Sequence, residues 1–257
     1  MEKEKRESLV FSEKEFLEEK SQTYMAGKSL HDNVMRELVV QTFKPFINGK
    51  IGLELGCSDG YMSELISKEL EHLDIVEGSE NFIKKAKERN LQNVSYFRCL
   101  FEEFKAVKQY DYVFACYILE HVSDVAETLK TVRSVLSPDG LLFVLVPNSQ
   151  ALSRQLAYHM GIIPDLKVLT QNDLNHGHRR VYDRCSLNRE LDEGGFVTIA
   201  QGGIMLKLLA DFQMDKLYEI GILQAPQING LYKLGFQYPD LCGCIYSICK
   251  LKDKESI

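Results

Sequence analysis

Residues 51–60 constrain the fold of this chain more than any other stretch. An apolar run, Ile-Gly-Leu-Glu-Leu, passes directly into the turn Gly-Cys-Ser-Asp-Gly, and a helical pattern follows. A strand that enters a glycine-rich turn and then a helix leaves backbone N–H groups where a ligand can approach them. The same turn also fits the G-x-S-x-G nucleophile elbow of hydrolases, with Ser58 as the nucleophile. Other features of the sequence are needed to distinguish a ligand-binding loop from a nucleophile elbow.

Short apolar runs alternate with helical patterns along most of the chain. The expected strands cover residues 51–55, 73–77, 94–98, 112–117, 141–146, 196–202 and 243–251. The expected helices between them include 60–70, 80–89, 122–136 and 186–193, and a Ser-Pro-Asp-Gly turn is expected at 137–140. Nearly continuous apolar strands joined by helices indicate an α/β fold with a doubly wound, seven-stranded, mostly parallel sheet.

Segments outside this alternation suggest how the chain is organised. Two helical segments precede the first strand, so residues 1–48 are expected to form an N-terminal helical cap on a main domain at 49–257. Within that domain, residues 149–183 interrupt the alternation of strands and helices, and we interpret them as a lid insertion. A late insertion at 204–242 is expected to hold one helix near 204–220 and then a long connection.

Composition narrows the classes of function. The chain has 257 residues, and 37 Asp and Glu against 31 Lys and Arg give a net charge of -6. An acidic protein has no general attraction for a phosphate backbone, so nucleic-acid partners are disfavoured. No run of eighteen apolar residues occurs, and no apolar segment follows the charged N-terminus. We therefore expect neither a membrane span nor secretion.

The seven cysteines are an odd number, and several lie in apolar runs. Free, buried thiols in a reducing cytoplasm explain this pattern better than a disulfide framework does. Cys242 and Cys244 lack a second pair of cysteines or histidines at zinc-ligand spacing, so no metal is expected there.

The loops after the first two strands carry the strongest functional signal. Ligands of parallel sheets bind beyond the carboxyl ends of the strands, where the strand order reverses. Glu54 and the turn at 56–60 end the first strand, and Glu77 ends the second, seventeen residues after Gly60. A carboxylate at this spacing can accept hydrogen bonds from both hydroxyls of a ribose.

Residues 50–147 resemble the class I S-adenosylmethionine-dependent methyltransferases, in particular the branch that acts on small molecules. The matching motifs, in the order of that family, are the E/D-x-G-x-G-x-G loop at 54–60, the ribose-binding acid at Glu77, the adenine-flanking segment at 98–102, the fourth-strand signature at 110–122 and the turn at 136–140. One departure is Ser58, which stands where the family usually has its middle glycine. That turn must give Ser58 backbone angles that suit glycine.

The resemblance implies a Rossmann-like methyltransferase fold whose last strand is antiparallel, with S-adenosyl-L-methionine as the cofactor. The cofactor-binding residues that it implies are Glu54, Gly56, Cys57, Ser58, Gly60, Glu77, Gly78, Leu100, Phe101 and Cys116. Methyl transfer is an in-line displacement, so the protein mainly has to align acceptor, methyl and sulfur and exclude water.

The candidate residues that bind or activate the methyl acceptor lie in the expected lid insertion and in the loop after the fourth strand. His121 and His178 are the candidate catalytic groups, and each can instead be a structural histidine. The candidate substrate-binding residues are Tyr24, His176, Arg179, Arg180 and Tyr182. A positive cluster in an acidic protein suggests a small, anionic acceptor, such as a phosphate, phosphoramidate, carboxylate or sugar derivative, methylated on oxygen or nitrogen. A solvated surface loop explains the cluster equally well.

Other interpretations remain open at this stage. An RNA or protein methyltransferase would need a basic stripe beside the pocket, and a non-catalytic protein would bind the cofactor without turnover. A serine hydrolase would use Ser58, although no glycine-rich oxyanion loop precedes it. Residues 208–214 either line the acceptor pocket or form homodimer contacts.

Overall fold

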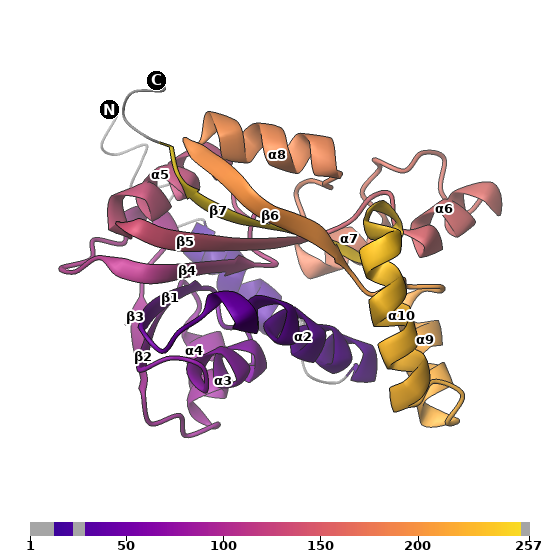
Figure 1. Ribbon diagram of the computed structural model, residues 1–257, viewed down its shortest axis with the longest axis horizontal. Coiled ribbons are helices and arrows are strands. Elements are labelled where there is room, and N and C mark those ends of the chain that lie inside the picture. The colour runs from indigo at the N-terminus through magenta and orange to yellow at the C-terminus, as the bar shows by residue number, and fades with distance from the viewer. Residues whose placement is uncertain (1–12, 23–28, 253–257) are drawn as a thin grey trace.

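A seven-stranded sheet forms the centre of the molecule (Figure 1). The structure is a computed structural model that describes residues 13–22 and 29–252. The strands are β1 (Ile51–Leu55), β2 (His72–Glu77), β3 (Val94–Arg98), β4 (Tyr110–Cys116), β5 (Leu136–Pro147), β6 (Phe196–Ile204) and β7 (Cys244–Leu251). Their order in the sheet is β3-β2-β1-β4-β5-β7-β6.

The strand directions confirm the predicted topology. Strands β1 to β5 pair in parallel, whereas β7 runs antiparallel to both β5 and β6. Because β1 neighbours both β2 and β4, the order reverses at β1. The carboxyl ends of β1 and β4 therefore flank the position where doubly wound sheets bind their ligands.

Helices cover both faces of the sheet. A first helix occupies residues 13–22. The others are α2 (Leu30–Phe43), α3 (Tyr61–Ser67), α4 (Glu80–Lys87), α5 (Val125–Val135), α6 (Leu152–His159), α7 (Gln171–His176), α8 (Arg184–Glu193), α9 (Asp211–Glu219) and α10 (Ala225–Gln237), with 3-10 turns at Lys44–Phe46, Phe101–Glu103 and Pro239–Leu241. None of the described helices has the length and apolar composition needed to cross a membrane.

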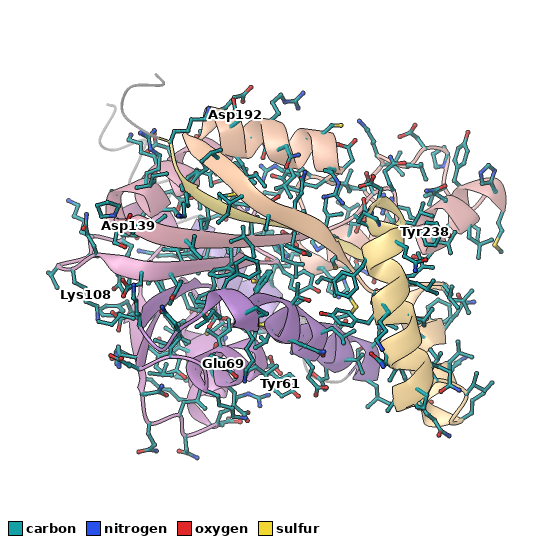
Figure 2. The ribbon with its side chains drawn as sticks, in the orientation of Figure 1. Tyr61, Glu69, Lys108, Asp139, Asp192 and Tyr238 are labelled. Atoms are coloured by element: carbon teal, nitrogen blue, oxygen red, sulfur yellow. The ribbon has the colours of Figure 1, made fainter. Side chains whose placement is uncertain are left out.

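Alternating strand residues build two separate cores. Phe114 and Phe143 stack with ring centroids 4.9 Å apart on the face covered by α2, α3, α9 and α10. Their strand neighbours Val113 and Val144 point to the other face, where α5 and α8 pack. Side chains fill the space between the sheet and both helix layers (Figure 2). The sheet is buried on both faces, as its continuous apolar strands indicate.

Two expectations about local structure were wrong. Residues 137–140 are not a turn before a strand, because β5 already begins at Leu136 and pairs there with Tyr110 before the register shifts. The long connection after α9 contains the helix α10. Its glycines hide the helical pattern, yet Gly235 has a packing role, since a Cβ there would lie 3.0 Å from the sulfur of Cys242.

Candidate active site

A cavity of about 160 Å³ lies at the carboxyl ends of the parallel strands. Its walls come from the loops after β1, β3 and β4, from the end of β2 and from the helix at 13–22. The predicted residues that line it are Glu54, Gly56, Cys57, Ser58, Glu77, Gly78, Leu100, Phe101, Cys116, His121 and His176. The fold thus gathers sequence-distant motifs around one space.

Three residues with positive φ shape the loop after β1. Gly56, Ser58 and Gly60 have φ values of 72°, 48° and 77°. The N–H of Gly60 donates to the carbonyl of Cys57 at 2.7 Å, which closes the turn. Ser58 accordingly adopts the left-handed conformation of the glycine it replaces, at a cost of about 1 kcal/mol. Its buried hydroxyl has no hydrogen-bond partner among the described residues, so no histidine activates it as a hydrolase would require.

Gly60 serves the turn rather than the cavity wall, because it is not among the cavity-lining residues. A Cβ at this position would lie 2.8 Å from the Cα of Ala86 on α4. Glycine thus permits both the positive φ and the close approach of α4.

Glu77 is the buried carboxylate at the end of β2, with 6% of its surface exposed. Its Oε2 accepts from the N–H of Cys57 at 3.2 Å, and its Oε1 accepts from the N–H of Ser79 at 2.8 Å. Burial raises the pKa of Glu77 above its ordinary value, although these N–H groups act against the shift. Each oxygen retains acceptor capacity, so the carboxylate can receive two further hydrogen bonds from the cavity.

Gly78 allows close packing next to this carboxylate. A Cβ on Gly78 would lie 2.5 Å from Leu17 and 3.2 Å from Leu100. Leu100 and Phe101 line the same part of the cavity. The result is an apolar slot directly beside Glu77, as a flat heterocycle attached to a ribose requires.

The other end of the loop carries an ionic group that includes one residue missed by the sequence interpretation. Arg36 on α2 lines the cavity and pairs with Asp59 at 3.0 Å. Near it, Glu54 is buried with Oε2 unpartnered among the described residues, and burial raises its pKa to about 8. The helix at 13–22 supplies Glu13, Phe16, Leu17 and Lys20, which were likewise not among the predicted site residues.

The two predicted cysteine contacts are buried thiols. Cys57 and Cys116 line the cavity, and burial raises the pKa of both well above the usual range. A thiol with a raised pKa is a poor nucleophile. Both cysteines therefore act as small apolar surface at the cavity.

The two candidate catalytic histidines are in contact with each other. The rings of His121 and His178 lie edge to face with centroids 4.7 Å apart. His121 lines the large cavity, whereas His178 lies behind it and lines a smaller one. Burial and the neighbouring His178 lower the pKa of His121 to about 3, so its imidazole is neutral at pH 7.

The predicted positive cluster is only partly at the cavity. His176 lines it, but Arg179 binds both carboxylate oxygens of Glu13 at 2.9 and 3.0 Å. Arg180 donates to the carbonyls of Leu119 and Val122, both at 2.6 Å. Arg179 and Arg180 are thus already bonded to protein groups.

The remaining two predicted substrate contacts are placed differently. Tyr182 lies outside the large cavity, where its hydroxyl donates to Glu190 at 2.6 Å. Tyr24 lies outside the described residues. This geometry favours a bracing role for Tyr182 and Arg180, which hold the segment after α7 against the loop after β4.

Comparison with known proteins shows the family of this chain. A sequence model of a methyltransferase domain matches residues 27–201. The chain therefore belongs to the methyltransferase domain family, which confirms the class of S-adenosylmethionine-dependent enzyme predicted from its motifs. Among solved structures, the complex of DhpI with S-adenosylhomocysteine superposes with a TM-score of 0.62 at 15% identity, over 96% of this chain and 98% of that one. At this identity the likeness concerns the fold.

Two curated relatives match over about half of this chain. The ubiquinone biosynthesis O-methyltransferase of Marinobacter nauticus is 30% identical over 53% of this chain and 63% of its own length. The mitochondrial enzyme of the same name from Bos taurus is 29% identical over 52% of this chain and 37% of its own. The chain thus spans less than two thirds of the length of these relatives.

Proposed function

We propose that this enzyme transfers the methyl group of S-adenosylmethionine to an oxygen of a small acceptor. The observation that carries the proposal is the buried carboxylate of Glu77, held by two backbone N–H groups with its free acceptor capacity toward the cavity. Ribose hydroxyls are the donors that such a carboxylate receives in this type of sheet.

The remaining cofactor contacts follow from the chemistry of the cavity wall. The apolar slot at Leu100 and Phe101 suits the adenine. At the other end, Glu54 is available to the ammonium group of the methionine part and Arg36 to its carboxylate. Opposite charges at this end match a zwitterion, and Ser58 and Gly56 let the backbone approach it.

The acceptor then occupies the part of the cavity between the helix at 13–22 and the loop after β4. Phe16 and Leu17 make one side apolar, and Lys20 and His176 supply polar atoms. Oxygen is favoured over nitrogen because the relatives with 29 and 30% identity are named as O-methyltransferases. An anionic acceptor remains a prediction, which the ammonium group of Lys20 in the acceptor part of the cavity supports.

Two further expectations belong to this proposal. All seven cysteines are free thiols, which suits the predicted reducing cytoplasm. A homodimer gains support from exposed apolar side chains in the late insertion, since Phe212 and Ile220 are 64% and 67% exposed. Light scattering of the purified chain tests the oligomeric state.

The test of the function combines binding and turnover. Calorimetry with S-adenosylhomocysteine is expected to give one site per chain, and cofactor labelled on its methyl group is expected to label one class in a panel of phenols, carboxylates and phosphorylated metabolites. No binding of S-adenosylhomocysteine would overturn the proposal. Binding without labelling of any acceptor would identify a non-catalytic cofactor-binding protein instead.

A further inference from the structure

A buried carboxylate lies beside the large cavity, in the loop after β4. Glu120 is 1% exposed, and neither of its carboxylate oxygens has a hydrogen-bond partner among the described residues. Its neighbour in the sequence, His121, lines the large cavity. Burying a carboxylate without a partner costs free energy, and buried titratable groups beside a cleft are candidates for a functional role.

Glu120 lies within reach of two histidines. One carboxylate oxygen of Glu120 and one ring nitrogen each of His121 and His178 lie within 4.8 Å of one another. A single water molecule that is hydrogen-bonded to two groups bridges atoms about 4.6 Å apart. The N–H of Arg179 donates to the carbonyl of Glu120 at 2.8 Å, which fixes the two segments against each other. A proton can therefore pass between His121 and Glu120 through one water or after a small side-chain rotation.

The ring of His121 is held in place by the segment after α7. It packs edge to face on the ring of His178, with centroids 4.7 Å apart. The Nδ1 of His178 lies 3.2 Å from one carboxylate oxygen of Asp173. The other oxygen of Asp173 accepts from the N–H and the hydroxyl of Thr170, at 2.8 and 2.7 Å. His121 therefore borders the large cavity with a fixed ring that also reaches Glu120.

The surroundings of Glu120 determine the pH at which it is charged. Burial raises the pKa of Glu120 to about 8; its own N–H and the guanidinium of Arg180 act against this rise, and Asp173 adds to it. The titratable and charged groups that face Glu120, from its own loop, α6, α7, the segment after α7 and the ends of β4 and β7, are His121, Arg154, Asp173, His178, Arg180, Tyr182, Cys116 and Cys244. Burial raises the pKa of both thiols and of the Tyr182 hydroxyl above their ordinary values, and the pKa of Asp173 is lowered. Glu120 is thus the carboxyl group of this set that ionises near pH 8.

We propose that Glu120 takes up the proton that the acceptor hydroxyl loses during methyl transfer, with His121 passing it on. This inference rests on the proposed transfer to oxygen. The acceptor oxygen binds the methyl carbon as the methyl–sulfur bond breaks, and the hydroxyl proton moves to one ring nitrogen of His121. The proton on the other ring nitrogen of His121 moves to the carboxylate of Glu120. The positive charge lost at sulfur balances the negative charge lost at Glu120.

Two groups are needed because a charged His121 is unfavourable at this position. Burial and the neighbouring His178 lower the pKa of His121 to about 3, so the ring does not readily hold an extra proton. Transfer of the second proton to Glu120 keeps the ring neutral. The arrangement also narrows the acceptor class to hydroxyl groups, such as phenols and alcohols. A carboxylate or phosphate oxygen has no proton to lose at neutral pH, so any anionic group of the acceptor is separate from the reacting oxygen.

Nuclear magnetic resonance of the ligand-free protein, labelled with nitrogen-15 in its histidines, tests this link without an acceptor. The ring-nitrogen shifts of His121, assigned by comparison with His121→Gln, are expected to change between pH 6 and 10 with a midpoint near 8, as Glu120 loses its proton. Glu120→Gln keeps the shape of the side chain and is expected to remove this step. Glu54→Gln is the matched control, because burial also raises the pKa of Glu54 to about 8, and the step at His121 is expected to remain in this variant.

Turnover gives a second measurement. With a hydroxyl acceptor from the labelling panel, Glu120→Gln is expected to lower kcat roughly 100-fold or more and to remove the rise of the rate near pH 8, while its affinity for S-adenosylhomocysteine stays that of wild type.

A wild-type His121 without a step between pH 6 and 10, or a step that persists in Glu120→Gln, overturns the role of Glu120 and leaves the proposed methyl transfer untouched. The wild-type spectrum alone can give this result, so the test does not depend on the folding of the variant. Absence of S-adenosylhomocysteine binding in the wild type is a different failure, which overturns the proposed function together with this role.

Discussion

Two buried carboxylates on neighbouring strands are held in opposite ways. Asp74 on β2 and Glu54 on β1 are each 2% exposed. Asp74 accepts a hydrogen bond from Tyr110 at 2.7 Å and pairs with Lys108 at 2.8 Å. Burial acts to raise the pKa of Asp74, but these partners outweigh it and the pKa is lowered. Glu54 has an oxygen without a partner, and burial raises its pKa to about 8.

The difference follows the two edges of the sheet. Lys108 lies at the amino edge of the parallel strands, at the left of Figure 2, and its cluster with Asp74 has all its charges paired within the fold. At the opposite edge, Glu54, Glu77 and Glu120 are buried with acceptor capacity left over. Buried polar groups are normally satisfied by the protein. The edge at which buried carboxylates lack protein partners is therefore the edge at which we expect ligands to bind.

The largest expected effect is the loss of cofactor affinity in Glu77→Ala. Two hydrogen bonds to a charged group, at roughly 1.5 to 3 kcal/mol each, correspond to a 100-fold or greater weakening. Calorimetry with S-adenosylhomocysteine measures it. Glu80→Ala is the matched control, because Glu80 is an exposed acid of the next helix that pairs with Lys84. Equal affinity in Glu77→Ala and wild type would show that Glu77 is not the ribose contact.

At the amino edge the expected effect is on stability alone. Asp74→Asn removes a charge that Lys108 and Tyr110 stabilise, which should lower the free energy of unfolding at pH 7 by about 2 kcal/mol and the melting temperature by about 4 to 8 °C. Because the folded pKa lies below the ordinary 3.8, this stabilisation is present above pH 3.8 and is lost as the pH falls further.

Thermal melts of wild type and Asp74→Asn across pH 3 to 8 measure this contribution. Unchanged affinity for S-adenosylhomocysteine is expected in the variant. If Asp74→Asn lost cofactor affinity as strongly as Glu77→Ala, the amino edge of the sheet would also contribute to cofactor binding, contrary to the comparison made above.

Glu54→Gln should have a smaller effect of opposite sign. Between the ordinary value of 4.5 and about 8, the folded protein takes up a proton that the unfolded chain releases, so stability falls as the pH rises. Glutamine carries no charge, so the variant does not lose stability in this way as the pH rises. Without cofactor, the variant is expected to melt a few °C above wild type at pH 8.5 and at the same temperature near pH 5. A lower melting temperature at pH 8.5 would mean that Arg36 compensates the charge.

The smallest effect is expected from Ser58→Gly. Glycine relieves roughly 1 kcal/mol of left-handed strain but costs roughly 0.5 to 1 kcal/mol of unfolded-chain entropy. The two nearly cancel, so the free energy of unfolding should change by less than about 0.5 kcal/mol. Urea titration measures it. A large loss of stability would show that the serine hydroxyl has a stabilising contact in solution.

Strand periodicity and turn residues predicted the sheet and the loop at 56–60, because those signals are local. Gly230 and Gly235 concealed α10, since helix propensity could not reveal that Gly235 packs against Cys242. Arg36 was missed because it lies on an earlier helix and reaches the cavity only through tertiary packing. A lone cation on an apolar helix face shortly before the glycine-rich turn was the available signal.

The positive cluster could not be interpreted from the sequence either. Its composition suggested an anion clamp, but Arg179 faces Glu13 and Arg180 faces carbonyl groups. Those partners are distant along the chain, and pairing of this kind depends on the fold. The same limit applies to His121 and His178, whose rings meet only where the segment after α7 reaches the loop after β4.

The helix at 13–22 is bonded to α4 on one side and to the segment after α7 on the other. Glu18 accepts from the N–H of Glu80 at 2.7 Å and from the hydroxyl of Ser79 at 2.9 Å, at the start of α4, while Glu13 pairs with Arg179 of the lid. One short helix therefore borders both the cofactor half and the acceptor half of the cavity. A ligand that stabilises this helix from either half makes the other half easier to fill, so we expect cofactor and acceptor to bind with positive cooperativity, each raising the affinity for the other by the same factor.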